Sequence, residues 1–304
     1  MRGSGLKSLI VDGNNTAFQA LGKAPLFHEG KRTEVIKIML TMLRGYLERF
    51  DPDAMVVVWD GGRDQRRKAV YPEYKRRKKA PTAAEKAERD VVFEQMRELM
   101  PILSGLGLEQ CKVNYREGDD IIYNILAHEF ASPGERIVIS TDQDMFQLLA
   151  EFADVSIFSP IKKLMIDSDW VEQTFDIPVG YFTLYKALVG DGSDNIPGIR
   201  GIGPKKAVGL IKFLSTKHSA EDHQKAILNV VHSEAELAKQ KLLVTFMPIA
   251  VEEMAEGWIE SGPVADVDAC LMAVAEQYGF EQIAERHESW IRPFTHYHLK
   301  RGAL

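Results

Sequence analysis

The sequence predicts an α/β fold with a central, mostly parallel sheet flanked by helices, followed by a helical region. In the first half of the 304-residue chain, short runs of Val, Ile and Leu alternate with stretches whose apolar residues have helical spacing. From about residue 169 onward, helical patterns and glycine-rich turns continue without a convincing strand. We therefore expect an α/β core over residues 1–170 and a helical region over 171–304, with the boundary near 165–180.

The strands and helices can be assigned in chain order. The expected strands are "LKSLIVD", "AMVVVWD", "GLEQCKV" and "RIVISTD", with "DVSIFSP" and "KKLMIDS" as an edge hairpin. The expected helices are one in the opening segment, then "EVIKIMLTMLRGYLERF", "EKAERDVVFEQMRELMPIL", "PVGYFTLYKALVG", "PKKAVGLIKFLSTK" and "EAELAKQKLLVTF". Strand, helix and strand in repetition indicate parallel strands joined by crossovers.

The composition is that of a globular protein, with 27% charged and 45% hydrophobic residues. No run approaches the roughly 18 apolar residues of a membrane span, and the N-terminus lacks the apolar region of a signal peptide. Cys111 and Cys270 form neither a disulfide framework nor a zinc-binding spacing. These features favour a cytoplasmic location.

The net charge is −6, but the positive charges are concentrated in one part of the sequence. Residues 63–79, "RDQRRKAVYPEYKRRKK", carry nine Lys or Arg and two acids, with Tyr71 and Tyr74 among the cations. A charged run is often only a solvated surface. Aromatic rings interleaved with cations also suit binding to phosphates and bases, so the stretch indicates a nucleic-acid partner.

Acidic residues gather where strands end and where one helix begins. Asp12, Asp60, Asp142 and Asp144 follow strands; Glu117, Asp119 and Asp120 begin a helix; Asp191 and Asp194 lie in "GDGSDNIPG". Acids in a first helical turn also cap the helix and complement its dipole. Because the carboxyl ends of parallel strands share one edge, however, we expect the nine acids to converge there, where their repulsion requires cations. Oxygen ligands without His or Cys predict Mg²⁺ or Mn²⁺.

A second feature is the glycine-rich turn in "NIPGIRGIGPKKAVGLIKFL". Gly198, Gly201 and Gly203 allow backbone amides to approach a phosphate, and the following proline suits the first position of a helix. Lys205 and Lys206 follow directly. The turn is either a simple connection between packed helices or, as we expect, a site for sequence-independent nucleic-acid binding.

Six motifs in this order resemble the structure-specific 5′ nuclease family, which includes flap endonucleases, phage 5′ exonucleases and the 5′-nuclease domain of bacterial DNA polymerase I. They are "VDGNN", "VVVWDGG", "PEYKRRKK", "REGDDIIYNILA", "VISTDQDMFQLL" and "ALVGDGSDNIPGIRGIGPKKA". The resemblance implies a PIN-like core, a basic helical arch at about 63–100 and a helix–three-turn–helix at 195–210. It also implies a stand-alone, metal-dependent flap endonuclease and 5′-3′ exonuclease of DNA replication or repair.

The same resemblance assigns roles to residues. It makes Asp12, Asp60, Glu117, Asp119 and Asp120 ligands of the main metal group, with Asp142 and Asp144 beside them, and Asp191 and Asp194 ligands of a second group. Two or more Mg²⁺ or Mn²⁺ ions are expected, with K⁺ at the glycine turn. Lys75 would neutralise the transferring phosphate, as would Arg67, and Tyr74 would stack near the scissile nucleotide. Arg66, Arg76, Arg77 and Lys78 would bind DNA; relatives often carry Asn-Arg where Arg77 and Lys78 stand.

The expected partner is DNA with 5′ flaps or 5′ ends, and RNA–DNA hybrids are a further substrate class, with the protein acting as a monomer. Two alternatives are a catalytically silent DNA-binding factor on the same fold and a PIN-type RNase. A third keeps the site but makes RNA primers the main substrate. The intact set of acids argues against a silent binder, because a protein that only binds phosphate gains nothing from repelling carboxylates.

Overall fold

The chain forms two compact units, neither of them continuous in sequence. The computed structural model describes residues 5–76, 80–128, 134–216, 222, 225–228, 231, 233–259, 261 and 266–302. Unit 1 comprises residues 1–62, 81–141 and 249–304, and unit 2 comprises residues 63–80 and 142–248. The chain therefore leaves unit 1 after residue 141, ahead of the boundary expected near 165–180, and its last segment returns to unit 1.

Unit 1 is built on a mostly parallel sheet with the strand order β6–β1–β4–β5–β9. Its strands are β1 (Leu6–Asp12), β4 (Ala54–Val58), β5 (Glu109–Cys111), β6 (Gly134–Ile139) and β9 (Trp258–Ile259), with a separate hairpin of β2 (Phe27–His28) and β3 (Lys31–Arg32). β1 pairs in parallel with β4 and β6, and its central residues Leu9, Ile10 and Val11 are fully buried. The expected parallel core is thus confirmed. The antiparallel strand β9 was not expected, because two residues carry too little pattern.

Helices cover this sheet. They are α1 (Gly13–Phe18), α2 (Glu34–Phe50), α4 (Ala83–Gly105), α5 (Gly118–Ala127), α12 (Val251–Glu256), α13 (Val267–Tyr278), α14 (Glu281–Glu285) and α15 (His287–Gly302). The helix α2 has the residues predicted from its apolar spacing, and it buries that face from Val35 to Phe50. The helix α4 begins with a capping box in which Thr82 and Glu85 bond each other's backbone amides.

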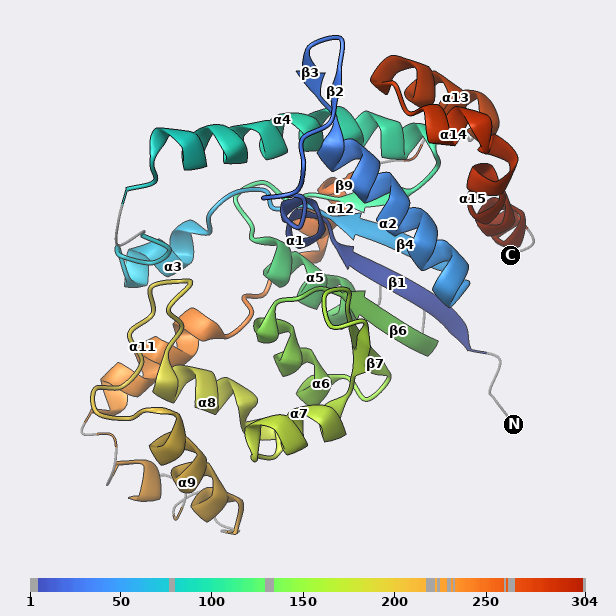
Figure 1. Ribbon diagram of the computed structural model, residues 1–304. Helices are drawn as coiled ribbons and strands as arrows, with labels where there is room; N and C mark the ends of the chain where they lie inside the picture. The colour runs from blue at the N-terminus through green and yellow to red at the C-terminus, as the bar shows by residue number, and fades with distance from the viewer. Residues whose placement is uncertain are drawn as a thin grey trace. The chain divides into compact units, whose positions relative to one another are not determined.

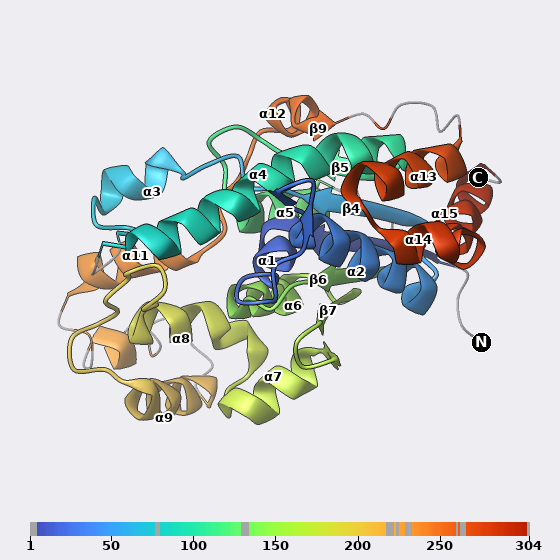
Figure 2. The ribbon, with the colours of Figure 1, turned by 45° about the horizontal axis from the view of Figure 1, so that its top comes forward.

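The C-terminal segment, whose role the sequence left open, completes unit 1. Figures 1 and 2 show α13, α14 and α15 beside α2 and α4, far from them in sequence. The Met55 N–H of β4 donates to the buried Tyr297 hydroxyl at 3.0 Å, and the Tyr278 hydroxyl donates to Glu98 at 3.0 Å. The described residues from 249 onward therefore belong to the core that carries the sheet.

Unit 2 is mainly helical. It contains α3 (Gln65–Val70), η1 (Gln143–Gln147), α6 (Leu148–Glu151), β7 (Val155–Ser159), β8 (Leu164–Ile166), α7 (Ser168–Phe175), η2 (Val179–Tyr181), α8 (Phe182–Val189), α9 (Pro204–Ser215) and α11 (Glu234–Val244). The strands β7 and β8 form the expected antiparallel hairpin. Phe146, Phe175 and Phe182 pack together, with ring centroids 5.1–6.0 Å apart. None of the helices described in either unit is both long and apolar enough to cross a membrane.

Candidate metal centre and nucleic-acid-binding residues

A cluster of carboxylates forms at the start of α5 in unit 1. One carboxylate oxygen from each of Glu117, Asp119 and Asp120 lies within 4.8 Å of the other two. Glu117 and Asp120 are buried and Asp119 is half-buried. Close carboxylates of this kind suit a hard divalent cation with oxygen ligands.

Asp60 is tied to this cluster through the backbone. Its Oδ1 accepts the Gly118 N–H at 2.6 Å, and its own N–H donates to Asn14 Oδ1 at 2.9 Å. A Cβ atom at position 118 would lie 2.8 Å from Asp60 Oδ1, so the approach requires glycine. The carboxylate that ends the β4 segment is therefore fixed against the amino end of α5.

Asp12 ends β1 and caps α1. Its Oδ1 accepts the Asn15 N–H at 2.9 Å, and its Oδ2 accepts the Ser140 hydroxyl at 2.9 Å. Because β1 is paired in parallel with β4, Asp12 and Asp60 lie at the carboxyl ends of neighbouring strands. We call Asp12, Asp60, Glu117, Asp119 and Asp120 the first acid group. Their all-oxygen donor set and fixed orientation fit Mg²⁺ or Mn²⁺.

Sequence reasoning missed the residues that orient these acids. Asn14, Asn15, Ser140 and Gly118 hold the carboxylates or their backbone in place. The polar "GNN" directly after a buried strand was the available indication. Such residues do for carboxylates what supporting hydrogen bonds do at other metal sites.

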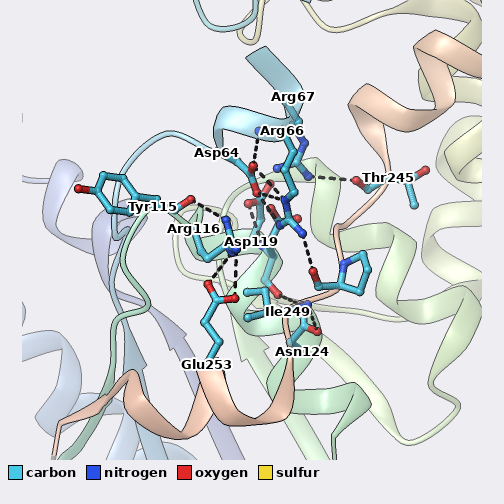
Figure 3. Close-up of polar contacts among 12 residues, drawn as sticks. Asp64, Arg66, Arg67, Tyr115, Arg116, Asp119, Asn124, Thr245, Ile249 and Glu253 are labelled. Atoms are coloured by element: carbon cyan, nitrogen blue, oxygen red, sulfur yellow. Dashed lines mark hydrogen bonds and ion pairs between the residues drawn. The ribbon is translucent and has the colours of Figure 1, made fainter. Parts of the chain in front are cut away.

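The turn before Glu117 is braced by the returning C-terminal segment (Figure 3). Arg116 forms an ion pair with Glu253 of α12, Nε to Oε1 at 2.8 Å, and its carbonyl accepts the Gly61 N–H at 2.9 Å. In α5, Asn124 Oδ1 accepts the Ile249 N–H at 2.9 Å. Residues 249–256 thus fix both the approach to the acid cluster and the helix that carries it.

The other four acids lie in unit 2, where a lysine stands among them. We call Asp142, Asp144, Asp191 and Asp194 the second acid group. Lys186 of α8 is 8% exposed, and its Nζ lies 2.6 Å from Asp144 Oδ1 and also pairs with Asp191 Oδ2. Lys186 was not singled out from the sequence, although it precedes Asp191 by five residues in "YKALVGD".

The environment shifts the ionisation of these groups. Burial disfavours the charged Asp191 carboxylate and acts to raise its pKa. Hydrogen bonds from Lys186 and Ser193 outweigh burial and lower this pKa to about 2. Burial also disfavours the charged Lys186, yet Asp144 and Asp191 raise its pKa above the usual value. Burial and the neighbouring Asp142 raise the pKa of Asp144 to about 7. The ammonium and the Asp191 carboxylate form a charged pair across the neutral pH range.

Residues 73–75, within the basic stretch 63–79, contact the loop that carries Asp194. The Lys75 N–H donates to the Asp194 carbonyl at 2.8 Å, and Lys75 Nζ lies 3.5 Å from Asp194 Oδ2. The Tyr74 hydroxyl donates to the same Oδ2 at 3.2 Å, and the Asn195 amide donates to the Glu73 carbonyl at 2.9 Å. Lys75 has a φ of +52°, an uncommon conformation for a lysine that these contacts hold in place.

The remaining cations of this segment differ in exposure. Arg67 is 2% exposed and donates to the Thr245 carbonyl at 3.0 Å (Figure 3). Its guanidinium also lies over the ring of Tyr74, which is itself 1% exposed. Arg66 pairs with Asp64, and the exposed Arg76 pairs with Glu73. Arg77 and Lys78 lie outside the described residues. Direct stacking of Tyr74 on a base would require this segment to open.

The glycine turn precedes α9, as predicted. Gly198 and Gly201 have positive φ values of +68° and +80°, Gly203 is the N-cap, and Pro204 is the first helical residue. Lys206 donates to the Gly201 carbonyl at 2.9 Å and remains exposed, as does Lys205. The free amides of the helix start and these exposed ammonium groups suit a phosphate.

Comparison with known proteins identifies the family. The model of the "5′-3′ exonuclease, N-terminal resolvase-like domain" matches residues 7–176. The chain belongs to the 5′-3′ exonuclease family. Among relatives of this family, a 5′-3′ exonuclease of Aquifex aeolicus is 31% identical over 67% of this chain and 68% of its own length. A flap endonuclease Xni of Shewanella denitrificans is 30% identical over 68% of this chain and 78% of its own length.

Solved structures agree with the fold. A crystal structure of the T5 D15 protein with metal ions has a TM-score of 0.64 and 20% identity, and covers 95% of this chain and 99% of that chain. A flap endonuclease-1 from Methanococcus jannaschii has a TM-score of 0.58 and 16% identity, and covers 98% of this chain and 93% of that chain. The expected family, fold class and enzyme class, a nuclease and therefore a hydrolase, are confirmed.

Proposed function

We propose that this 5′-3′ exonuclease family member is a divalent-metal-dependent, structure-specific nuclease that cuts DNA near 5′ single-strand/duplex junctions during replication or repair. The observation that carries the proposal is the first acid group. Its core of three carboxylates lies within 4.8 Å, and Asp60 is bonded to the same helix start. Relatives named 5′-3′ exonuclease and flap endonuclease support this class of activity.

The protein holds the carboxylates in advance of metal binding. The Gly118 N–H fixes Asp60, the Ser140 hydroxyl and Asn15 N–H fix Asp12, and α5 orients the remaining three acids. Mg²⁺ or Mn²⁺ bound there would lower the pKa of a water for in-line attack and stabilise the leaving oxygen. No side-chain nucleophile is then required.

Residues of unit 2 would supply positive charge to the substrate. Lys75 is the residue we assign to the transferring phosphate, where negative charge develops in the transition state. The buried Tyr74 and Arg67 would act by positioning Lys75, because the Lys75 Nζ and the Arg67 guanidinium both lie over the Tyr74 ring, 5.4 and 5.8 Å from its centroid. Arg66 and Arg76, with Arg77 and Lys78, would add contacts to DNA.

The glycine turn would hold duplex DNA without reading its sequence. The exposed Lys205 and Lys206 and the amides at the start of α9 would bind one backbone phosphate, and carbonyls of the turn would bind K⁺. A crystal structure of the T5 D15 endonuclease with DNA and metal ions supports a DNA partner. We further propose that the protein acts as a monomer in the cytoplasm of a bacterial or phage-infected cell and accepts RNA–DNA hybrids.

The test uses a 5′-labelled DNA flap, a matched flap with an RNA 5′ segment and a blunt duplex, each with Mg²⁺ or EDTA. Release of a short 5′ product near the junction, only with metal, is the expected result. Comparison of the two flaps gives the preference between DNA and RNA. Tight binding without cutting in either Mg²⁺ or Mn²⁺ would overturn the proposal in favour of a DNA-binding factor. Cutting only within the single-stranded RNA segment of the second flap would favour an RNase.

A further inference from the structure

We propose that Lys186 serves as a built-in cation of the second acid group, so that this group binds no divalent ion in the wild-type protein. The proposal departs from the expectation that Asp191 and Asp194 complete a second metal group. It concerns metal binding and does not depend on the substrate assigned above.

The Lys186 ammonium pairs with two of the four acids. The Lys186 ammonium contacts one oxygen of Asp144, at 2.6 Å, and one oxygen of Asp191. A metal ion would need the same oxygens at roughly 2.0–2.6 Å, depending on the ion. The ammonium and a divalent ion therefore compete for one position.

The charge of Lys186 also opposes a divalent ion at this group. Lys186 is 8% exposed, so a divalent ion beside its ammonium would meet repulsion that water screens poorly. The other Asp191 oxygen, Oδ1, accepts the Ser193 N–H at 2.7 Å and the Asp194 N–H at 3.2 Å, and these bonds hold the carboxylate in its orientation toward Lys186. Asp194 Oδ2 accepts the Tyr74 hydroxyl and pairs with Lys75. The ammonium groups of Lys186 and Lys75 thus pair with one oxygen each of Asp144, Asp191 and Asp194.

The test counts Mn²⁺ ions bound per chain, from the loss of the electron paramagnetic resonance signal of free Mn²⁺. In the wild-type background, Asp119→Asn should reduce binding, whereas Asp144→Asn and Asp191→Asn should leave the count unchanged. Loss of a bound ion in either of the latter variants overturns the proposal.

The complementary variant is Lys186→Met, which removes the ammonium and keeps the length of the side chain. We expect Lys186→Met to bind one Mn²⁺ ion more than the wild type, with an affinity for Mn²⁺ at the second acid group at least tenfold higher. Adding Asp144→Asn to this variant should abolish the additional ion. Lys212→Met is the matched control, because Lys212 pairs with Asp176 at an exposed position. A folded Lys186→Met protein with no additional ion also overturns the proposal; if the variant does not fold, the Asp144→Asn and Asp191→Asn counts decide.

A separate observation concerns Tyr115, two residues before Glu117. Its side chain is one of the most exposed large apolar groups described, with the residue 68% exposed, and its φ is +60°, a strained conformation for a bulky residue. The Tyr115 N–H donates to the Gly61 carbonyl at 2.9 Å, which fixes the turn. Figure 3 shows the ring pointing away from Arg116 and Glu253.

Strained residues of this kind persist only where the surrounding structure holds them, and they cluster at functional sites. We infer that the Tyr115 ring is a stacking platform for a nucleobase of the bound strand, an inference that rests on the proposed DNA substrate. The ring is presented to solvent on a rigid turn next to the first acid group, and aromatic rings stack on any base without sequence preference.

The experiment places 2-aminopurine at successive nucleotides around the junction of a DNA flap and measures its fluorescence on binding in EDTA. Wild-type protein and Tyr115→Phe should shift the fluorescence at one position; Tyr115→Gly should abolish that shift and weaken binding roughly fivefold or more. Tyr115→Gly should be at least as stable as wild type, because glycine tolerates the positive φ. Equal shifts and affinity in Tyr115→Gly would overturn the inference, whereas failure of the wild type to bind would instead count against the proposed function.

Discussion

The two acid groups keep carboxylates together by different means. In unit 1, backbone amides and a serine hydroxyl orient Asp12, Asp60 and Asp119, and the oxygens of Glu117, Asp119 and Asp120 converge. In unit 2, ammonium groups of Lys186 and Lys75 pair with Asp144, Asp191 and Asp194. Neutral donors orient a carboxylate and leave its charge for a metal ion, whereas a buried lysine neutralises that charge permanently. Clustered acids therefore do not by themselves make a metal site.

The largest expected effect comes from the first acid group. Asp119→Asn should slow cleavage of a DNA flap by about 1000-fold or more, because it removes a charged ligand of the metal that stabilises the transition state. Binding of the flap, followed by fluorescence anisotropy, should change little. Asp90→Asn, an exposed acid of unit 1, is the control. A cleavage rate near that of the wild type would remove the distinction between the two groups.

Lys75→Ala should reduce the single-turnover cleavage rate by about 100-fold at saturating protein, with similar flap affinity, because the proposed role of Lys75 is to neutralise charge on the reacting phosphate. Arg76→Ala is the matched control, since Arg76 is the next cation along the chain and pairs only with Glu73 among the contacts observed. Equal losses in the two variants would show that general positive charge, and not the position of Lys75, matters.

The sign of a stability change distinguishes the two groups directly. In EDTA, Asp191→Asn should lower the free energy of unfolding by about 2 kcal/mol, because it breaks a buried ion pair and Asp144 retains only part of the interaction with Lys186. Asp119→Asn should leave that free energy unchanged or raise it by up to about 1 kcal/mol, because it relieves repulsion. Urea unfolding at constant m-value measures both changes. Destabilisation of similar size in both variants would contradict the comparison.

The smallest effect is expected at the glycine turn, outside both acid groups. The double change Lys205→Ala/Lys206→Ala should weaken duplex binding about tenfold at physiological salt and lower the slope of log affinity against log salt by up to about two. Cleavage at saturating protein should persist. Lys212→Ala, at the other end of α9, is the control. An unchanged salt slope would mean that these ammonium groups do not contact phosphate.

Much of the fold and part of the site could be predicted from local patterns. The buried strands before Asp12 and Asp60, the apolar face of α2 and the Gly203–Pro204 start of α9 each depend on residues close in sequence. The helix that begins with Glu117, Asp119 and Asp120 follows from the same local chemistry of caps and apolar spacing. Local patterns in the sequence are therefore enough to predict the α/β core, the family motifs and the acid cluster of α5.

The groups that these residues contact depend on long-range packing. The return of residues 249–304 to unit 1, the two-residue strand β9 and the Arg116–Glu253 pair join segments more than a hundred residues apart, and no local pattern specifies them. The same holds for Lys186, which has the sequence context of an ordinary helical lysine. Whether its ammonium reaches water or two carboxylates depends on packing, and the charge of the second acid group depends on that contact.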